Sequence, residues 1–354
     1  MDVGIPYKGF SQSNHFNSLK YKVMRIKQAI GIEISKLTFD VRIHSNQMFN
    51  QFENTNKGFK KLMKWVNSNN PFLKDETIFV FEHTGIYSYL LSVFLTEQKL
   101  SFALVPGLEI KRSLGISRGK DDKIDATKIA LYGYRLRDEI KLYNMPCKDI
   151  INLKRLLSLR DRFVKQRAGY KSSLKEFSRI LALKNNKVLL ETQEKIIRYL
   201  TKQINIIEQN LDSIINSNDT LKNVFKLITS VKCVGRQTAL FIITYTEAFA
   251  KFKTWRQFAS YCGTAPFPNS SGTSLRGNTQ VSHLANKKVK SLLDLCAKVA
   301  IQHNPEMKAF YKRRVTEGKN KMSTINIIRN KLLSRIFAVV NRETPYVDFM
   351  KYAA

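Results

Sequence analysis

Residues 29–43 read Ala-Ile-Gly-Ile-Glu-Ile-Ser-Lys-Leu-Thr-Phe-Asp-Val-Arg-Ile, and they contain two runs of strand-forming residues. The first run, residues 29–35, is mostly apolar. In the second run, Phe39, Val41 and Ile43 alternate with polar residues, which is the period expected of a strand with one buried face. The short interval between the runs predicts two paired strands.

The residues that follow continue the same unit with alternating strand and helix patterns. They predict a strand at 48–52, a helix at 57–67, a strand at 77–81, a helix at 87–98, a strand at 101–105 and a helix at 121–136. The order β-β-β-α-β-α-β-α is typical of a mixed α/β sheet with helices packed on it.

The next segment predicts two long helices, with a break at Asn185-Asn186. In the second helix, apolar residues recur at alternating spacings of three and four, as in a coiled-coil seam. The seam is formed by Ile197, Leu200, Ile204, Ile207, Leu211 and Ile214. Two interpretations stay open: an arm that meets another protomer, and an ordinary helical bundle that packs on itself.

From Leu221 onward we expect an all-α domain. Residues 231–239 resemble a helix-hairpin-helix element, in which Gly235 allows a tight turn and the N–H groups that open the next helix can meet a phosphate. A glycine turn between two packed helices is nearly as good an interpretation of this short segment.

The net charge of +32 over 354 residues points to a polyanionic partner. Residues 1–140 carry 21 Lys and Arg and 14 Asp and Glu, whereas residues 141–354 carry 39 and 14. The surface that binds nucleic acid is therefore expected mainly in the second part, and the basic arm at residues 1–28 would add to it. No apolar run approaches the ~18 residues of a membrane span, so we expect a cytoplasmic protein with no membrane partner.

Other chemistries fit the sequence poorly. The four cysteines lie far apart, and the five histidines have no partner at metal-binding spacing, which disfavours zinc. The chain has no G-x-x-x-x-G-K-[ST] loop, which disfavours an ATP-driven motor.

Four acids are the candidates for metal-dependent chemistry. Glu33 stands inside an apolar strand, where an unpaired carboxylate is costly, and Glu82 ends another strand. Asp122 and Asp125 are three residues apart on one helical face. Carboxylates from these places could hold one or two Mg²⁺ ions against a phosphodiester, although acids in a first helical turn more often act as caps.

A second candidate segment is Gly263-Thr-Ala-Pro-Phe-Pro-Asn-Ser-Ser-Gly272. Its composition is that of a plain turn. Basic residues follow it, however, and a hydroxyl on a phosphate-binding surface is a possible nucleophile. The basic residues that we assign to nucleic-acid binding, together with Gly235, are Lys232, Arg236, Arg276, Lys287, Lys288 and Lys290.

Four segments together resemble one family of insertion-sequence transposases. These segments are Gly31-Ile-Glu-Ile-Ser-Lys36, Phe81-Glu-His-Thr-Gly85, Lys120-Asp-Asp-Lys-Ile-Asp-Ala126, and Gly263-Thr-Ala-Pro266 with Ser271-Gly272. The family, which includes Piv-type invertases, pairs a DEDD domain of RNase H-like fold, similar to Holliday-junction resolvases, with a C-terminal serine domain. The resemblance covers the chain from Ala29 to about Val347.

The resemblance implies that Glu33, Glu82, Asp122 and Asp125 bind Mg²⁺ and that Ser271 is the nucleophile toward DNA. It also implies a structured bridge RNA that pairs with donor and target DNA, and a dimer or tetramer whose sites combine different protomers. The family usually has Asp where this chain has Glu33.

Residues and resemblance together predict four parts. They are a basic arm at 1–28, an RNase H-like DEDD domain at 29–148, a coiled-coil helical hairpin at 149–220 and a helical transposase domain at 221–354. The expected function is RNA-guided DNA recombination in the prokaryotic cytoplasm, at the nucleoid. The alternatives are a metal-dependent nuclease that hydrolyses DNA junctions with water, and a nucleic-acid-binding protein whose catalysis Glu33 has weakened.

Overall fold

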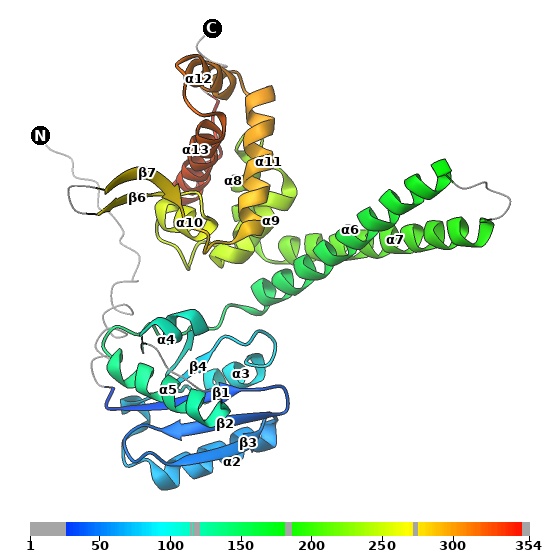
Figure 1. Cartoon of the computed structure of the whole chain (residues 1–354). Coiled ribbons are helices and arrows are strands. Elements are labelled where there is room, and N and C mark those ends of the chain that lie inside the picture. The colour runs from blue at the N-terminus through cyan, green and yellow to red at the C-terminus, as the bar shows by residue number, and fades with distance from the viewer. Residues whose placement is uncertain (1–25, 114, 116–120, 181–185, 272–274, 349–354) are drawn as a thin grey trace, which may run out of the picture. The chain divides into compact units, whose positions relative to one another are not determined.

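The computed structural model divides into two compact units, residues 1–145 and 146–354 (Figure 1). The structure describes residues 26–113, 115, 121–180, 186–271 and 275–348. The expected basic arm lies outside these residues as far as position 25. Across the described residues, no helix combines the length and the hydropathy that crossing a bilayer requires.

A five-stranded mixed sheet in the order β3-β2-β1-β4-β5 forms the centre of the first unit. The central strand β1 pairs antiparallel with β2 and parallel with β4. All five strands confirm the sequence prediction within about one residue. Their bounds are β1 Gln28–Ile34, β2 Thr38–Ile43, β3 Phe49–Glu53, β4 Thr77–Glu82 and β5 Phe102–Val105.

Helices cover both faces of this sheet, because each face carries its own apolar cluster. The helices α2 and α3 pack on the face of Ile30 and Ile32, and α4 and α5 pack on the face of Ala29 and Val80. The short helix α4 was not predicted. The bounds are α2 Asn56–Asn69, α3 Tyr89–Glu97, α4 Gly107–Ser113 and α5 Asp122–Arg135, with a 3₁₀ turn at Lys74–Glu76.

Gly31 fixes how closely α5 approaches the sheet. A Cβ atom at Gly31 would lie 2.2 Å from the backbone nitrogen of Ala130 and 2.4 Å from the carbonyl oxygen of Ala126. Only glycine permits this contact. Because Gly31 has no side chain, α5 can pack directly against β1, the strand that carries Glu33.

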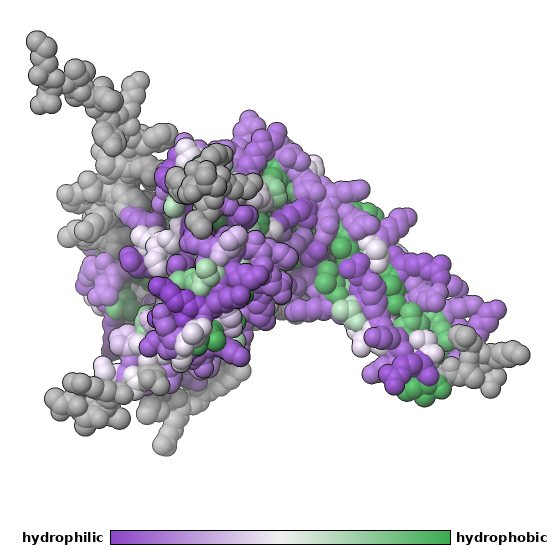
Figure 2. Space-filling model, turned by 90° about the horizontal axis from the view of Figure 1, so that it is seen from above, coloured by the Kyte–Doolittle hydropathy of each residue, from purple (hydrophilic) through white to green (hydrophobic). Residues whose placement is uncertain are grey.

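The second unit begins with two antiparallel helices, α6 (Lys148–Ile180) and α7 (Lys187–Ser217), which lie side by side (Figure 1). Leu200, Ile204, Ile207 and Leu211 of the predicted seam are buried within the single chain. At these positions the seam thus packs internally. Near the end of the hairpin, the apolar side chains of Ile180 on α6 and Val188 on α7 are exposed. Hydrophobic residues lie among hydrophilic ones along this part of the molecule (Figure 2).

The rest of the second unit packs helices around one large apolar core. They are α8 Asp219–Ser230, α9 Arg236–Thr246, α10 Trp255–Cys262, α11 Lys287–His303, α12 Pro305–Thr316 and α13 Lys321–Arg342. The prediction of an all-α domain is wrong at one place, because β6 (Pro266–Ser271) and β7 (Leu275–Val281) form an antiparallel hairpin. Pro266 and Pro268 cannot continue a helix, and on a two-stranded ribbon prolines are tolerated.

The turn between α8 and α9 differs from its prediction in one detail. Gly235 is the N-cap of α9 with extended backbone (φ −84°, ψ 167°), and a Cβ there would meet nothing. The residue in the left-handed region is Cys233, with φ 71°. Gly235 is therefore not what makes this turn tight.

Candidate active site

Polar side chains form a row across the sheet of the first unit, at the end where β1 and β4 finish. Glu33 on β1 stands opposite Asp40 on β2, and Asp40 stands opposite Gln51 on β3. On the other side, Ile32 pairs with Phe81, so Glu82 is the next residue of β4 beyond this pair. Glu33 and Glu82 therefore lie on adjacent strands at the same end of the sheet.

The helix α5 adds the two aspartates. Asp121 is its N-cap, and the Asp121 carboxylate accepts a hydrogen bond from the backbone N–H of Lys123. Because Asp121 performs the capping, Asp122 and Asp125 are not needed for it. Asp125 forms an ion pair with Lys128 at 2.8 Å.

The electrostatics of Glu33 show that these acids act on one another. Burial, followed by the charges of Glu82, Asp125, Asp122 and Asp40, raises the pKa of Glu33 to about 7. Like charges that raise a pKa favour a bound cation at the same place. The donors are all carboxylate oxygens, which by their chemistry suit a hard divalent ion. Among the described residues, however, no three His, Cys, Asp or Glu side chains lie close enough together to hold a metal ion, so the four acids would have to move closer to one another to share one.

Gly107 provides the space for Glu82. A Cβ atom at Gly107, the first residue of α4, would lie 2.1 Å from Oε1 of Glu82. A larger residue would push this carboxylate away from the row. The role of Gly107 could not be predicted, since nothing local in the sequence distinguishes it from an ordinary turn glycine.

The raised pKa of Glu33 predicts how metal-free stability depends on pH. The pKa of this carboxyl is about 7 in the folded protein against 4.5 for the ordinary group, so the folded state binds the proton more tightly. Protonation of Glu33 therefore stabilises the fold fully below pH 4.5, and this stabilisation is lost as the pH rises through about 7. In EDTA, the thermal midpoint of the wild type should therefore fall relative to that of Glu33→Gln between pH 5 and pH 8. Circular dichroism at both pH values measures this difference, and parallel curves would contradict it.

The β6–β7 hairpin places the predicted nucleophile at a strand end. Ser271 is the last residue of β6 and pairs with Leu275, and Ser270 pairs with Arg276. Ser270 is exposed. The side chains of Ser271 and Arg276, and all of residues 272–274, lie outside the described part of the chain.

Thr264, just before β6, is held by side chains of α13. Its carbonyl oxygen accepts hydrogen bonds from Nδ2 of Asn326 at 2.8 Å and of Asn330 at 2.9 Å. Its hydroxyl lies 2.9 Å from Oδ1 of Asn330 and can donate to it. Thr264 is fully buried, so these bonds fix the direction in which the chain leaves α10 toward the hairpin.

Replacing Asn330 with leucine should destabilise the second unit by about 1–3 kcal/mol, because two buried hydrogen bonds are lost together. Asn341→Leu, an exposed site on the same helix, is the matched control and should change stability by less than about 0.5 kcal/mol. Urea unfolding followed by tryptophan fluorescence measures both variants. Equal effects would show that the Asn330 contacts contribute little.

Several of the predicted nucleic-acid-binding cations have carboxylate partners. Lys232 pairs with Asp348 at 2.8 Å, Arg236 pairs with Asp212 at 2.8 Å, and Lys288 pairs with Asp161. By contrast, Lys287 is exposed. Burial, and then the neighbouring Arg329, lowers the pKa of Lys290. A phosphate would meet Lys287 more easily than the paired residues.

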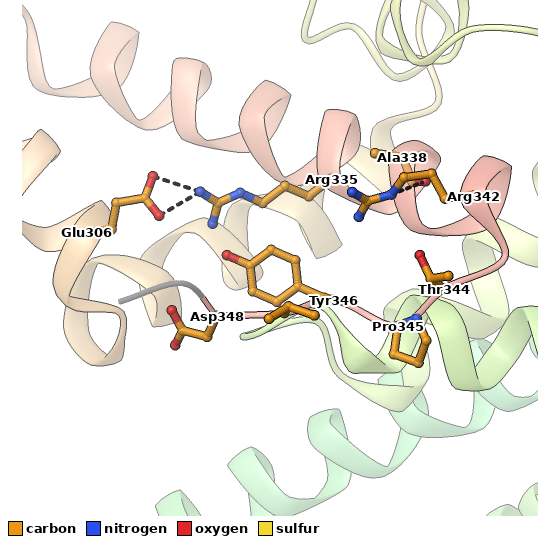
Figure 3. Close-up of a pocket in the computed structure, with 9 residues that line it drawn as sticks. Glu306, Arg335, Ala338, Arg342, Thr344, Pro345, Tyr346 and Asp348 are labelled. Atoms are coloured by element: carbon orange, nitrogen blue, oxygen red, sulfur yellow. Dashed lines mark hydrogen bonds and ion pairs between the residues drawn. The ribbon is translucent and has the colours of Figure 1, made fainter. Parts of the chain in front are cut away.

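The C-terminal segment that supplies Asp348 packs against α12 and α13 (Figure 3). Arg335 donates to both carboxylate oxygens of Glu306 at 2.7 Å, and its guanidinium lies 5.3 Å from the ring centre of Tyr346. The backbone N–H of Tyr346 donates to Oγ of Ser230 at 2.8 Å. These contacts hold the segment beside the α8–α9 turn, where Asp348 reaches Lys232.

Comparison with known families assigns both units. Residues 30–182 match the DEDD transposase model of the IS110 type, and residues 225–312 match the model described as Transposase IS116/IS110/IS902 family. Two regions of the chain are therefore similar to transposase domains of the IS110 type. The mixed sheet and its helices are consistent with the RNase H-like fold of such DEDD domains. The activity class is therefore transposition, a form of DNA recombination.

Individual relatives extend this similarity over most of the chain. The pilin gene-inverting proteins of Moraxella bovis and Moraxella lacunata are each 28% identical over 327 residues, which is 90% of this chain and 98% of theirs. An uncharacterized 43.6 kDa protein of insertion element IS110 from Streptomyces coelicolor is 28% identical over 124 residues, 35% of this chain and 30% of its own.

Proposed function

We propose that this transposase cuts and rejoins DNA through a covalent bond between Ser271 and a DNA phosphate. The observation that carries the proposal is the common electrostatic field of Glu33, Glu82, Asp122 and Asp125, in a chain with both IS110-type domains. The match at residues 225–312 includes Ser271 and its hairpin, which supports a chemical role for that segment.

In the proposed reaction, Oγ of Ser271 forms a bond to phosphorus as the bond from phosphorus to one deoxyribose oxygen breaks. The serine loses its proton, and the leaving oxygen takes up a proton to become a hydroxyl group. Attack by a hydroxyl group of another strand reverses these changes and releases the serine, so the phosphoester energy is conserved and ATP is not needed. Glu33, Glu82, Asp122 and Asp125 would hold Mg²⁺, which would stabilise negative charge on the phosphate.

A structured guide RNA is the second part of the proposal. A protein with net charge +32 can hold nucleic acids through their phosphates, and such contacts give affinity without sequence information. Base pairing by an RNA would supply the missing specificity. Sequencing of RNA that co-purifies with the protein should return one structured transcript; recovery of unrelated cellular RNA would contradict guidance.

We further propose a dimer or tetramer in which acids and serine of different protomers form one site. Exposed apolar residues on both helices, such as Ile180 of α6 and Val188 of α7, support association through the hairpin. Analytical ultracentrifugation of the full chain should give a mass of at least two protomers.

The covalent bond has a direct test. The protein is incubated with donor and target DNA, denatured and digested with protease, and the peptide attached to DNA is identified by mass spectrometry. The proposal requires a peptide that contains Ser271 with the modification on that residue. Cleaved DNA without any attached peptide would favour the alternative, a junction nuclease that uses water, for which the acids of the first unit would suffice.

A further inference from the structure

Asp40 is a fifth acid beside the four that the sequence predicts for the site. It lies on β2, directly opposite Glu33, so the two side chains share the face that α5 covers. The alternation of Thr38, Asp40 and Arg42 suggests an outward, solvated position. The structure instead buries Asp40, leaving 4% of it exposed.

The contacts of Asp40 leave its charge largely uncompensated. Nε2 of Gln51, the residue opposite it on β3, donates to Oδ1 at 3.1 Å and to Oδ2 at 3.3 Å. Within the described residues, no ion pair reaches Asp40. Its charged neighbours are other acids, namely Glu33 on β1 and Asp121 and Asp122 at the start of α5. A buried carboxylate with one neutral donor is costly unless a cation lies nearby.

We propose that Asp40 is a positioning residue of the divalent-cation site, oriented by Gln51, and that it increases the affinity of the site for the ion. This inference rests on the proposed function, in which Glu33 and the α5 aspartates hold Mg²⁺. Magnesium keeps several of its water ligands in proteins. Asp40, one strand away from Glu33, would accept hydrogen bonds from such waters and add negative charge to the site. Gln51 limits the carboxylate to one orientation by donating to both of its oxygens.

The test measures cation binding by calorimetry, with Mg²⁺ or Mn²⁺ alone and the full-length protein. Asp40→Asn keeps the shape and removes the charge, and we expect affinity to fall by about 10- to 100-fold, as for other residues behind metal ligands. Gln51→Leu keeps the charge of Asp40 but removes the donor that orients its carboxylate, and it should cause a smaller loss of affinity. Glu53→Gln is the matched control, since Glu53 is an exposed acid two residues from Gln51 on β3, and it should bind like the wild type.

The outcomes separate this inference from the proposed function. If Asp125→Asn loses cation binding while Asp40→Asn binds like the wild type, the role proposed for Asp40 is wrong and the proposed metal site is retained. If the wild type shows no saturable cation binding, both the proposed metal site and the role proposed for Asp40 are wrong. If Glu53→Gln weakens binding as much as Asp40→Asn, the effect is one of net charge, and Asp40 has no special position. The thermal midpoint in EDTA is a check on folding, and Asp40→Asn should not lower it, because the substitution removes repulsion among the acids.

Discussion

Replacing Ser271 with alanine should abolish both the covalent DNA adduct and recombination, and leave binding of DNA and RNA intact. Removing a nucleophile that acts together with other catalytic groups lowers the reaction rate by ~10³-fold or more. The substitution deletes one hydroxyl at the end of β6, and the backbone pairing with Leu275 does not depend on that hydroxyl. Denaturing gels with labelled DNA measure the adduct, and a two-plasmid assay measures recombination.

Ser270 provides the matched control for this experiment. It is the preceding residue of the same strand and carries the same hydroxyl group, and its side chain is exposed. Ser270→Ala should retain activity within a few fold of the wild type. If Ser271→Ala still recombined DNA, or if Ser270→Ala were the inactive variant, the assignment of the nucleophile would be wrong.

The fold of the first unit could be predicted from sequence because its strands carry strong local patterns. Residues 29–43 predicted β1, β2 and their pairing, and the predicted helices 57–67 and 121–136 are present with ends shifted by one or two residues. The helix α4 has seven residues, too few for a periodic pattern. The β6–β7 hairpin was missed because its prolines and polar residues resemble a turn, and its pairing is a contact between segments.

The site could be predicted only in part, since burial and charge pairing are tertiary properties. Glu33 could be predicted as a site residue because a carboxylate is unusual inside an apolar strand. The alternation that includes Asp40 gave no sign that α5 buries this residue. Likewise, Lys232 and Lys288 appeared as free cations because their carboxylate partners lie 116 and 127 residues away in the sequence.

Replacing Glu33 with glutamine should abolish adduct formation and recombination, although Glu33 and Ser271 are far apart in the sequence. The substitution keeps the volume of the side chain and removes its charge from a site where Glu82, Asp122 and Asp125 already act on it. If Glu33 holds Mg²⁺, loss of its charge weakens the cation site, and we expect a decrease of ~10³-fold in the recombination rate. Calorimetry with Mg²⁺ should show weaker binding by the same variant.

Glu33→Asp distinguishes a metal ligand from an acid that is merely tolerated. The family that the chain resembles usually has Asp here, and Glu carries its carboxylate about 1.5 Å farther from the backbone, a displacement that can change rates by ~10²-fold when positioning matters. The aspartate variant keeps the charge, so it should retain Mg²⁺ binding and recombine DNA at least as fast as the wild type. If Glu33→Gln were as active as the wild type, Glu33 would have no part in the reaction. If Glu33→Asp were as inactive as Glu33→Gln, the length of the side chain would be essential, and the rest of the site must have adapted to glutamate.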